Sequence, residues 1–192
     1  MLNALPSLYF DLVNDRFSFP IDLERPSFLI SSVYNCYETS FGGMRMLEGS
    51  NNWFFGPYFG LHRAFAGVFT PGYPLDSARF LNHTLNVSND TLKNYVNDNF
   101  IGQAVGNRRP GTSLTLGNRL NGDIAEFIIV SGVVADSNRR LIDSYLMDKY
   151  APPISLGADR VLCAFPDTID AFKDYLRSYS WSNGDTTSTT II

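Results

Sequence analysis

Short runs of alternating apolar and polar residues fill roughly the first 150 positions, and they predict β-strands separated by turns. Residues 8–19 indicate two short strands around the turn pair Asn14-Asp15. Residues 27–37 carry apolar side chains on both faces, as expected of a strand between two layers. Residues 113–117 predict a further short strand. The pattern favours an all-β fold over this region.

One stretch departs from the pattern. Residues 124–130 are rich in β-branched and aromatic side chains and predict a strand. Residues 138–150 then place apolar side chains along one stripe at helical spacing. Asp136 or Ser137 is the expected N-cap, because a short side-chain oxygen can accept from the free backbone N–H groups there. Pro152-Pro153 ends the helix, since proline disfavours helical geometry in the residue before it.

Residues 45–69 hold the densest group of aromatic side chains, punctuated by glycines into short strands and turns. One interpretation is a sandwich core, in which Phe65 is fully buried. The other is a platform for a sugar ring, because apolar C–H faces stack on rings while hydroxyls need directed polar partners. The residues proposed for that platform are Asn52, Trp53, Tyr58, His62 and Arg63.

The bulk properties exclude several function classes. The 15 Lys and Arg against 19 Asp and Glu give a net charge of −4 with no basic cluster, which argues against a nucleic-acid partner. No apolar run reaches the roughly 18 residues of a membrane span, so no membrane insertion is expected. The start of the chain shows no signal peptide. Hydrophobic residues at 44% allow a packed core, in which Cys36 is expected as a small buried side chain.

The sequence gives little support for a catalytic site or a metal site. Retaining glucan hydrolases need two carboxylates about 5–5.5 Å apart, and residues two apart share a face of a strand. Asp123 and Glu126 are three apart and are expected on opposite faces. Two histidines and no cysteine pair at ligand spacing leave a zinc site unsupported. Calcium needs only oxygen ligands and stays possible, with candidate residues Asp15, Asp76, Asp90 and Asp98.

The strand-and-helix stretch resembles the closing segment of bacterial concanavalin A-like (laminin-G-like) lectin/glucanase domains. The matching residues are Gly122, Asp123, Ile124, Ala125 and Glu126, followed by Arg139, Ile142, Tyr145, Leu146, Lys149 and Tyr150. The resemblance implies a jelly-roll sandwich of two antiparallel sheets with one short helix at about 137–149. It also implies a hairpin over residues 93–102, and a chain that begins inside a domain. Leu12 and Asp98 stand where that family usually has glycine.

Residues 154–192 resemble the start of the PKD-like or immunoglobulin-like modules of surface proteins from gliding, type IX-secreting bacteria. The matching residues are Leu156, Gly157, Asp159, Leu162, Cys163, Thr168, Asp170, Ala171, Tyr179, Trp181, Ser182, Gly184 and Thr186. The expected domains are therefore 1–152, the lectin-like domain, and 153–192, a partial module. Cys36 and Cys163 fall in different modules, so no bond between them is expected.

These resemblances imply a non-catalytic carbohydrate-binding or adhesive module of a larger secreted or cell-surface protein. Its expected partners are a glycan or surface polysaccharide and the other modules of the same polypeptide. Two alternatives stay open: an accessory or degenerate fragment of a polysaccharide-degrading enzyme, and a structural spacer without a ligand. A fold does not determine a function.

Overall fold

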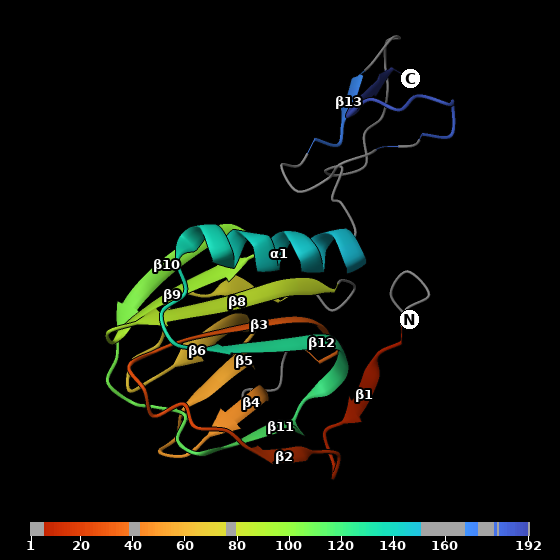
Figure 1. The fold of residues 1–192 in the computed structure, drawn as a ribbon. Coiled ribbons are helices and arrows are strands. Elements are labelled where there is room, and N and C mark those ends of the chain that lie inside the picture. The colour runs from red at the N-terminus through yellow and green to blue at the C-terminus, as the bar shows by residue number, and fades with distance from the viewer. Residues whose placement is uncertain are drawn as a thin grey trace.

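The computed structural model shows a sandwich of two antiparallel β-sheets, with one α-helix lying across the outside of one sheet (Figure 1). The structure describes residues 6–38, 43–75, 80–150, 168–172, 179 and 181–191. Within these residues, no helix is long and apolar enough to cross a membrane. The all-β class predicted from the sequence, with two antiparallel sheets and one helix, is confirmed.

The first sheet has the strand order β1-β12-β3-β8-β9-β10, and the second sheet has the order β2-β11-β4-β5-β6-β7. The strands of the first sheet are β1 (Leu8–Asp11), β3 (Ser27–Cys36), β8 (Leu81–Ser88), β9 (Thr91–Val96), β10 (Asn99–Val105) and β12 (Asn121–Ser131). Those of the second are β2 (Phe17–Pro20), β4 (Arg45–Gly49), β5 (Phe54–Tyr58), β6 (Leu61–Phe65), β7 (Tyr73–Pro74) and β11 (Ser113–Arg119). The helix is α1 (Asp136–Tyr150), and β13 (Thr168–Asp170) pairs with β14 (Thr189–Ile191).

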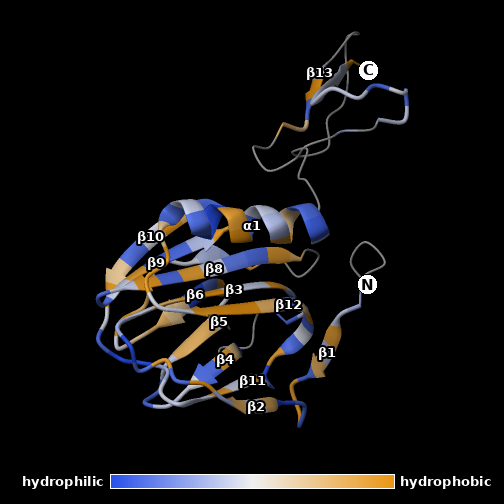
Figure 2. Ribbon diagram, viewed as in Figure 1, coloured by the Kyte–Doolittle hydropathy of each residue, from blue (hydrophilic) through white to orange (hydrophobic). Residues whose placement is uncertain are grey.

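Strand β3 is buried along its whole length, as expected for a strand between two layers. One of its faces contributes Phe28, Ile30 and Tyr34 to the core between the sheets. The opposite face places Val33 against Leu146 and Tyr150 of α1. In Figure 2, β12 is mostly apolar while α1 mixes apolar and polar residues, which fits a helix with one face against the sheet. The second sheet and helix α1 thus each pack an apolar side against β3.

The two short strands predicted over residues 8–19 exist, but they belong to different sheets. β1 pairs with β12 and β2 pairs with β11, so the turn between them carries the chain from one layer to the other. Leu12 lies in this turn with a φ of 71°, a left-handed conformation that glycine adopts far more easily. Leucine at this position therefore leaves the turn formed but strained.

The predicted hairpin is also present, between β9 and β10. Asn99 pairs with Val96, so Asn97 and Asp98 form a two-residue turn, and both have positive φ. The carboxylate of Asp98 accepts a hydrogen bond from Arg139 of α1 at 2.7 Å. An aspartate at this position therefore adds an ion pair between hairpin and helix that glycine would lack.

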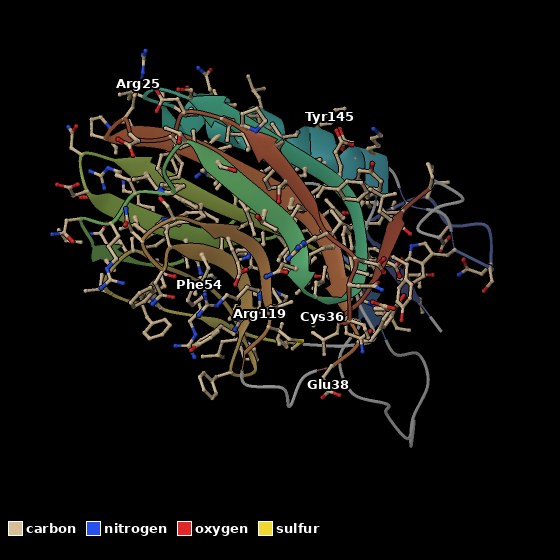
Figure 3. The ribbon with its side chains drawn as sticks, turned by 90° about the horizontal axis from the view of Figure 1, so that it is seen from below. Arg25, Cys36, Glu38, Phe54, Arg119 and Tyr145 are labelled. Atoms are coloured by element: carbon tan, nitrogen blue, oxygen red, sulfur yellow. The ribbon has the colours of Figure 1, made fainter. Side chains whose placement is uncertain are left out.

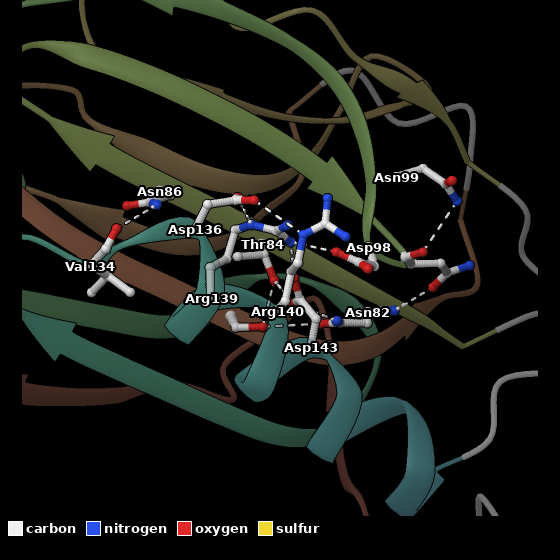
Figure 4. A network of polar contacts seen from close by, with 12 residues as sticks. Asn82, Thr84, Asn86, Asp98, Asn99, Val134, Asp136, Arg139, Arg140 and Asp143 are labelled. Atoms are coloured by element: carbon white, nitrogen blue, oxygen red, sulfur yellow. Dashed lines mark hydrogen bonds and ion pairs between the residues drawn. The ribbon is translucent and has the colours of Figure 1, made fainter. Parts of the chain in front are cut away.

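Helix α1 carries a buried ion pair between Arg139 and Asp143, which are 1% and 0% exposed, and each of the two side chains also contacts the sheet (Figure 4). Asp143 also accepts hydrogen bonds from Asn82 at 2.8 Å and from Thr84 at 2.6 Å, both on β8. The Arg139 guanidinium lies 3.9 Å from the ring centroid of Tyr95 on β9. Every charge in this network has a partner, which is the condition under which a buried pair is tolerated.

The first residue of α1 does not act as the sequence predicts. A capping role is expected for Asp136 or Ser137. In the structure, the Asp136 carboxylate accepts from the guanidinium groups of Arg139 at 2.7 Å and Arg140 at 3.1 Å. Negative charge near a helix N-terminus remains favourable there because of the helix dipole.

The expectation that Asp123 and Glu126 point to opposite faces of their strand is wrong. A β-bulge lies between Ile124 and Glu126, so Asp123 pairs with Asn35 and Glu126 pairs with Val33. Because Asn35 and Val33 are two apart on β3, both carboxylates lie on the same face, the one that α1 partly covers. The extra residue of a bulge moves each later side chain of that strand to the opposite face of the sheet.

Both of these carboxylates are nonetheless held by neighbouring side chains. Glu126 accepts hydrogen bonds from Lys149 at 2.7 Å, Tyr150 at 2.8 Å and Tyr145 at 3.0 Å. These bonds outweigh partial burial and lower the pKa of Glu126. Asp123 accepts from Tyr37 and from Ser7. Tyr145, Lys149 and Tyr150 of α1 thus fasten the helix to β12.

A hydrogen-bonded chain of Tyr34 and two histidines crosses the core. The Tyr34 hydroxyl lies 2.6 Å from Nδ1 of His62 and 3.0 Å from Nδ1 of His83. His83 Nε2 is 2.7 Å from Asn94 Oδ1, and Asn94 Nδ2 donates to the Pro71 carbonyl at 2.9 Å. Since the Asn94 amide donates elsewhere, its oxygen accepts, and His83 carries its proton on Nε2.

The direction of the whole chain follows from that assignment. His83 Nδ1 accepts from the Tyr34 hydroxyl, so the Tyr34 oxygen accepts from His62 Nδ1–H. His62 Nε2 is then a bare acceptor, and it has no hydrogen-bond partner in the described part of the chain. Burial lowers the pKa of His83 to about 3 and that of His62 well below its ordinary value. Both imidazoles are therefore neutral at pH 7.

Candidate functional site

A cluster of aromatic rings lies on the outer face of the second sheet. Phe54 and Tyr58 come from β5, Phe65 from β6, and Phe69 from the segment after β6. The Phe54 centroid is 4.6 Å from that of Tyr58 and 5.5 Å from that of Phe65, and the Phe69 centroid is 4.8 Å from that of Phe65. Figure 3 shows Phe54 and Tyr145 of α1 on opposite sides of the molecule. The cluster is thus remote from the helix.

Strand alternation explains why these rings face outward. On β5, Phe55 joins the core between the sheets, so Phe54 and Tyr58 point the other way. On β6, Ala64 joins the core, and Arg63 and Phe65 point outward. Phe54 pairs directly with Phe65 across the two strands, which brings the rings into contact.

The rings differ in how much of them reaches solvent. Phe54 is 1% exposed and forms the floor of the cluster, whereas Phe69 is 42% exposed. Tyr58 and Phe65 are half-buried. The expectation that Phe65 is fully buried is therefore wrong, because its position on β6 points away from the core. An apolar floor with partly exposed rings around it forms a surface on which a flat apolar ligand face can stack.

Three arginines lie over these rings. The Arg45 guanidinium carbon is 4.5 Å from the Phe54 centroid, that of Arg63 is 4.8 Å from Phe69, and that of Arg108 is 5.4 Å from Phe65. Such distances are within the range of cation–π attraction, which holds a guanidinium flat over a ring. We call the surface formed by these arginines and rings the aromatic–arginine face. Its members are Arg45, Phe54, Tyr58, Arg63, Phe65, Phe69 and Arg108.

The positive charges of this face are only partly balanced. Arg45 pairs with Glu48 at 3.2 Å. Arg63 donates instead to the Tyr58 carbonyl at 3.3 Å, and Arg108 donates to the Asn51 carbonyl at 3.2 Å. Neither Arg63 nor Arg108 has a carboxylate partner among the residues that the structure describes. Within the described residues, two guanidinium groups thus border the rings without an ion pair.

The structure places the five residues that the sequence suggested for a sugar platform in three different locations. Trp53 and His62 are 0% and 2% exposed, so their proposed role as ligand contacts is wrong. Trp53 packs against Phe28 in the core, and His62 faces inward because it alternates with Arg63 on β6. Tyr58 and Arg63 lie together on the aromatic–arginine face.

Asn52 is exposed and lies in a different place. It lines a polar cleft of about 610 Å³ whose walls are Glu24, Asn51, Asn52, Asn107, Arg108 and Arg109. Because Arg108 also lies over Phe65, this cleft borders the aromatic–arginine face at one end. The sequence does not single out Arg45 and Arg108, because nothing in the local pattern shows that Arg45 of β4 and Arg108 of the loop before β11 lie over the same group of rings.

A second, larger cleft of about 880 Å³ lies beside the start of α1, and the β9–β10 hairpin lines it. Its walls include Lys93, Tyr95, Asp98, Phe100, Gln103 and Arg139. The charged groups here are largely engaged in the helix anchor, since Arg139 pairs with Asp98, Asp136 and Asp143. Phe100 provides one exposed ring, which makes it a useful comparison for the aromatic–arginine face.

The residues suggested for calcium do not fit a cation site. Asp90 is paired with Arg109, and Asp98 with Arg139, so the positive charge beside each already occupies the carboxylate. Asp15 accepts a backbone N–H from Asp11, and Asp76 lies outside the described residues. Over the described ranges, no group of three or more His, Cys, Asp or Glu side chains is placed to hold a metal.

Cys36 is a free, buried thiol, 2% exposed, in line with its expected role as a small core residue. Burial raises its pKa to about 11, so the thiol stays protonated at neutral pH. The prediction that Cys36 and Cys163 are not bonded also involves Cys163, which lies outside the described residues.

Comparison with known proteins gives a fold but no family. No family model matches the sequence, and no curated protein matches it. Among solved structures, domain 4 of AbnA, an extracellular arabinanase from Geobacillus stearothermophilus in complex with arabinotriose, is similar. Its TM-score is 0.54 at 11% identity, and the match covers 69% of this chain and 73% of that domain.

Two further structures share the architecture. The binding domain of botulinum neurotoxin DC, in complex with SialylT, matches with a TM-score of 0.51 at 12% identity over 74% of this chain and 45% of that one. A heptameric SAP-like pentraxin from Limulus polyphemus matches with a TM-score of 0.51 at 8% identity, over 69% and 78%. At these identities the likeness shows the fold, a two-sheet β-sandwich, and no more.

Proposed function

We propose that this chain is a non-catalytic carbohydrate-binding module and that the aromatic–arginine face is its binding surface. The observation that carries the proposal is the set of partly exposed rings of Tyr58, Phe65 and Phe69, bordered by the guanidinium of Arg63. Apolar C–H faces of a sugar stack on rings, while its hydroxyls need directed partners. The arabinanase domain and the neurotoxin domain, whose structures hold a glycan, support the proposal at the level of the fold.

Removing a ring from this face tests the proposal. We expect Phe69→Ala or Tyr58→Ala to weaken glycan retention roughly ten- to a hundredfold, the effect of losing an aromatic anchor at an interface. The measurement is the dissociation constant for the best-binding members of a glycan array. Phe100→Ala is the matched control, since Phe100 is 54% exposed but lies on β10 of the first sheet.

The control should bind as the unchanged protein does, and all variants should keep the far-ultraviolet spectrum of a β-sandwich. Equal affinities for Phe69→Ala, Tyr58→Ala and the unchanged chain would show that the glycan binds elsewhere. A selective loss in Phe100→Ala would point to the cleft beside α1 instead.

The proposal includes the absence of catalysis. Asp123 and Glu126 share a face, but Lys149 and two tyrosines hold Glu126, while Tyr37 and Ser7 hold Asp123. A carboxylate fixed in such an ion pair has a lowered pKa and is poorly suited to donate a proton as the general acid that glycoside hydrolysis requires. We expect no release of reducing sugar from β-glucans or arabinans over a day of incubation. Turnover that disappears in Glu126→Gln would contradict this expectation.

The setting of the module is part of the same proposal. We place it outside the cell or at the cell surface, within a longer polypeptide that carries further modules. The extracellular arabinanase supports this placement by analogy. The two-domain division at residue 152 and the likeness of residues 153–192 to a PKD-like module remain predictions from the sequence.

A further inference from the structure

The polar groups that the arginines contribute to the aromatic–arginine face are all hydrogen-bond donors, and none is an acceptor. A guanidinium offers five N–H donors and no acceptor. Arg45, Arg63 and Arg108 therefore line the rings with donors only. A neutral sugar presents hydroxyls, which both donate and accept, and a site for it usually mixes amides or carboxylates with donors.

The carboxylate that pairs with Arg45 is already occupied. Glu48 accepts from Arg45 at 3.2 Å and from Asn118 at 2.7 Å, and Nε of Arg119 lies 3.6 Å away. Three neighbouring donors thus leave little of its acceptor capacity for a ligand. The Tyr58 hydroxyl remains a group that can both donate and accept.

The two arginines without a carboxylate partner lie over different rings. Arg63 is over Phe69 and Tyr58, whereas Arg108 is over Phe65. The Phe65 and Phe69 rings touch, with centroids 4.8 Å apart, so apolar surface connects the two positive groups. A ligand that spans them needs an apolar face between acceptor-rich groups.

From this arrangement we infer that the face binds an anionic polysaccharide, one with carboxylate or sulfate groups on a chain of sugar rings. This inference rests on the proposed function and names the ligand class of the same face. The sugar rings stack on Phe65 and Phe69, and the acidic groups accept hydrogen bonds from Arg63 and Arg108. Guanidinium and oxyanion match in a two-bond geometry, and such charge-assisted bonds are stronger than neutral ones.

The net charge of the chain shows that attraction to a polyanion must be local. The net charge is −4, so the protein as a whole repels a polyanion. Attraction to an acidic polymer must therefore come from a local surface. Two arginines without a carboxylate partner among the described residues, beside partly exposed rings, provide one.

The test compares each charged polymer with its neutral counterpart. Polygalacturonate and its methyl ester form one pair, and dextran sulfate and dextran form the other, so the two pairs separate carboxylate from sulfate. Affinity electrophoresis or calorimetry with the full chain measures the binding. We expect at least one charged polymer to bind about tenfold or more tightly than its neutral counterpart, and the difference to shrink between 50 and 500 mM salt because the charges are screened (roughly a threefold drop in Debye length).

Variants locate the charge effect. Arg63→Gln and Arg108→Gln should each weaken binding of the charged polymer about tenfold and leave binding of the neutral one almost unchanged. Arg140→Gln is the matched control, because it makes the same charge change on α1, where the Arg140 side chain is 64% exposed. Its affinity should equal that of the unchanged chain.

Three other outcomes would contradict the inference. Equal binding of charged and neutral polymers, with no effect of Arg63→Gln or Arg108→Gln, overturns the inference and leaves the proposed function standing. Binding of no polysaccharide at all overturns both. Binding to vesicles of anionic lipid in place of the polymers also overturns both, and would assign the face to a membrane surface.

Discussion

Arg139→Ala is expected to lower the free energy of unfolding by about 3–5 kcal/mol, the cost of leaving one charge of a buried pair without its partner. Asp143 would remain fully buried, with hydrogen bonds from Asn82 and Thr84 but no counter-charge. The link between α1 and the turn of the β9–β10 hairpin would be lost as well, because Arg139 also binds Asp98. Urea-induced unfolding of the two proteins measures the difference.

The neighbouring residue provides the control. Arg140 also pairs with Asp136, at 3.1 Å, but its side chain is 64% exposed. Arg140→Ala should therefore change stability by no more than about 1 kcal/mol, the usual worth of a surface ion pair. A double change, Arg139→Met with Asp143→Leu, should recover much of the loss, since it removes both buried charges. Equal effects of Arg139→Ala and Arg140→Ala would mean that the buried pair does not anchor the helix.

Acid is expected to destabilise the fold between pH 8 and pH 5, by about 2 kcal/mol from His83 and by a further loss from His62. Both have a folded-state pKa below the ordinary value of about 6.5, to about 3 for His83, because burial disfavours the charged ring. The unfolded chain therefore binds more protons in this range. Stability is fully present above the unfolded pKa and is lost as pH falls toward the folded one.

The chain suits this measurement because it has only two histidines, and both are buried. Carboxylates titrate mainly below pH 5, so the window above that value reports the imidazoles. Urea unfolding at a series of pH values gives the slope, and His83→Gln should make it clearly smaller. A stability that stays flat from pH 8 to pH 5 would show that the histidines are reached by water or protonated in the fold.

The fold was predictable where its signals are local. The apolar spacing over residues 138–150 and the prolines that follow predict α1 nearly to its ends. Asn97 and Asp98 tolerate left-handed geometry and predict the hairpin turn. The separation of β1 and β2 into different sheets depends on pairing with β12 and β11, far along the chain, so no local pattern indicates it.

The candidate site was only partly predictable for related reasons. Alternation along β6 separates Arg63 from the buried His62, but composition alone grouped the two together. Trp53 precedes β5, where alternation does not apply, and its ring turns into the core. The bulge near Ala125 shifts Glu126 to the face of Asp123, and a bulge leaves no clear mark in a single sequence. Arg45 and Arg108 reach the rings only through the tertiary fold.

The most direct test of the central claim observes the rings themselves during binding. Aromatic proton signals are assigned in the unchanged protein, and an acidic oligosaccharide, a short polygalacturonate, is added in steps. We expect the signals of Tyr58, Phe65 and Phe69 to shift and saturate together, while those of Phe100 on β10 and Tyr145 on α1 stay fixed. Saturating shifts at Phe100 and Tyr95, with unmoved signals at Phe65 and Phe69, would contradict the assignment of the binding surface to the aromatic–arginine face.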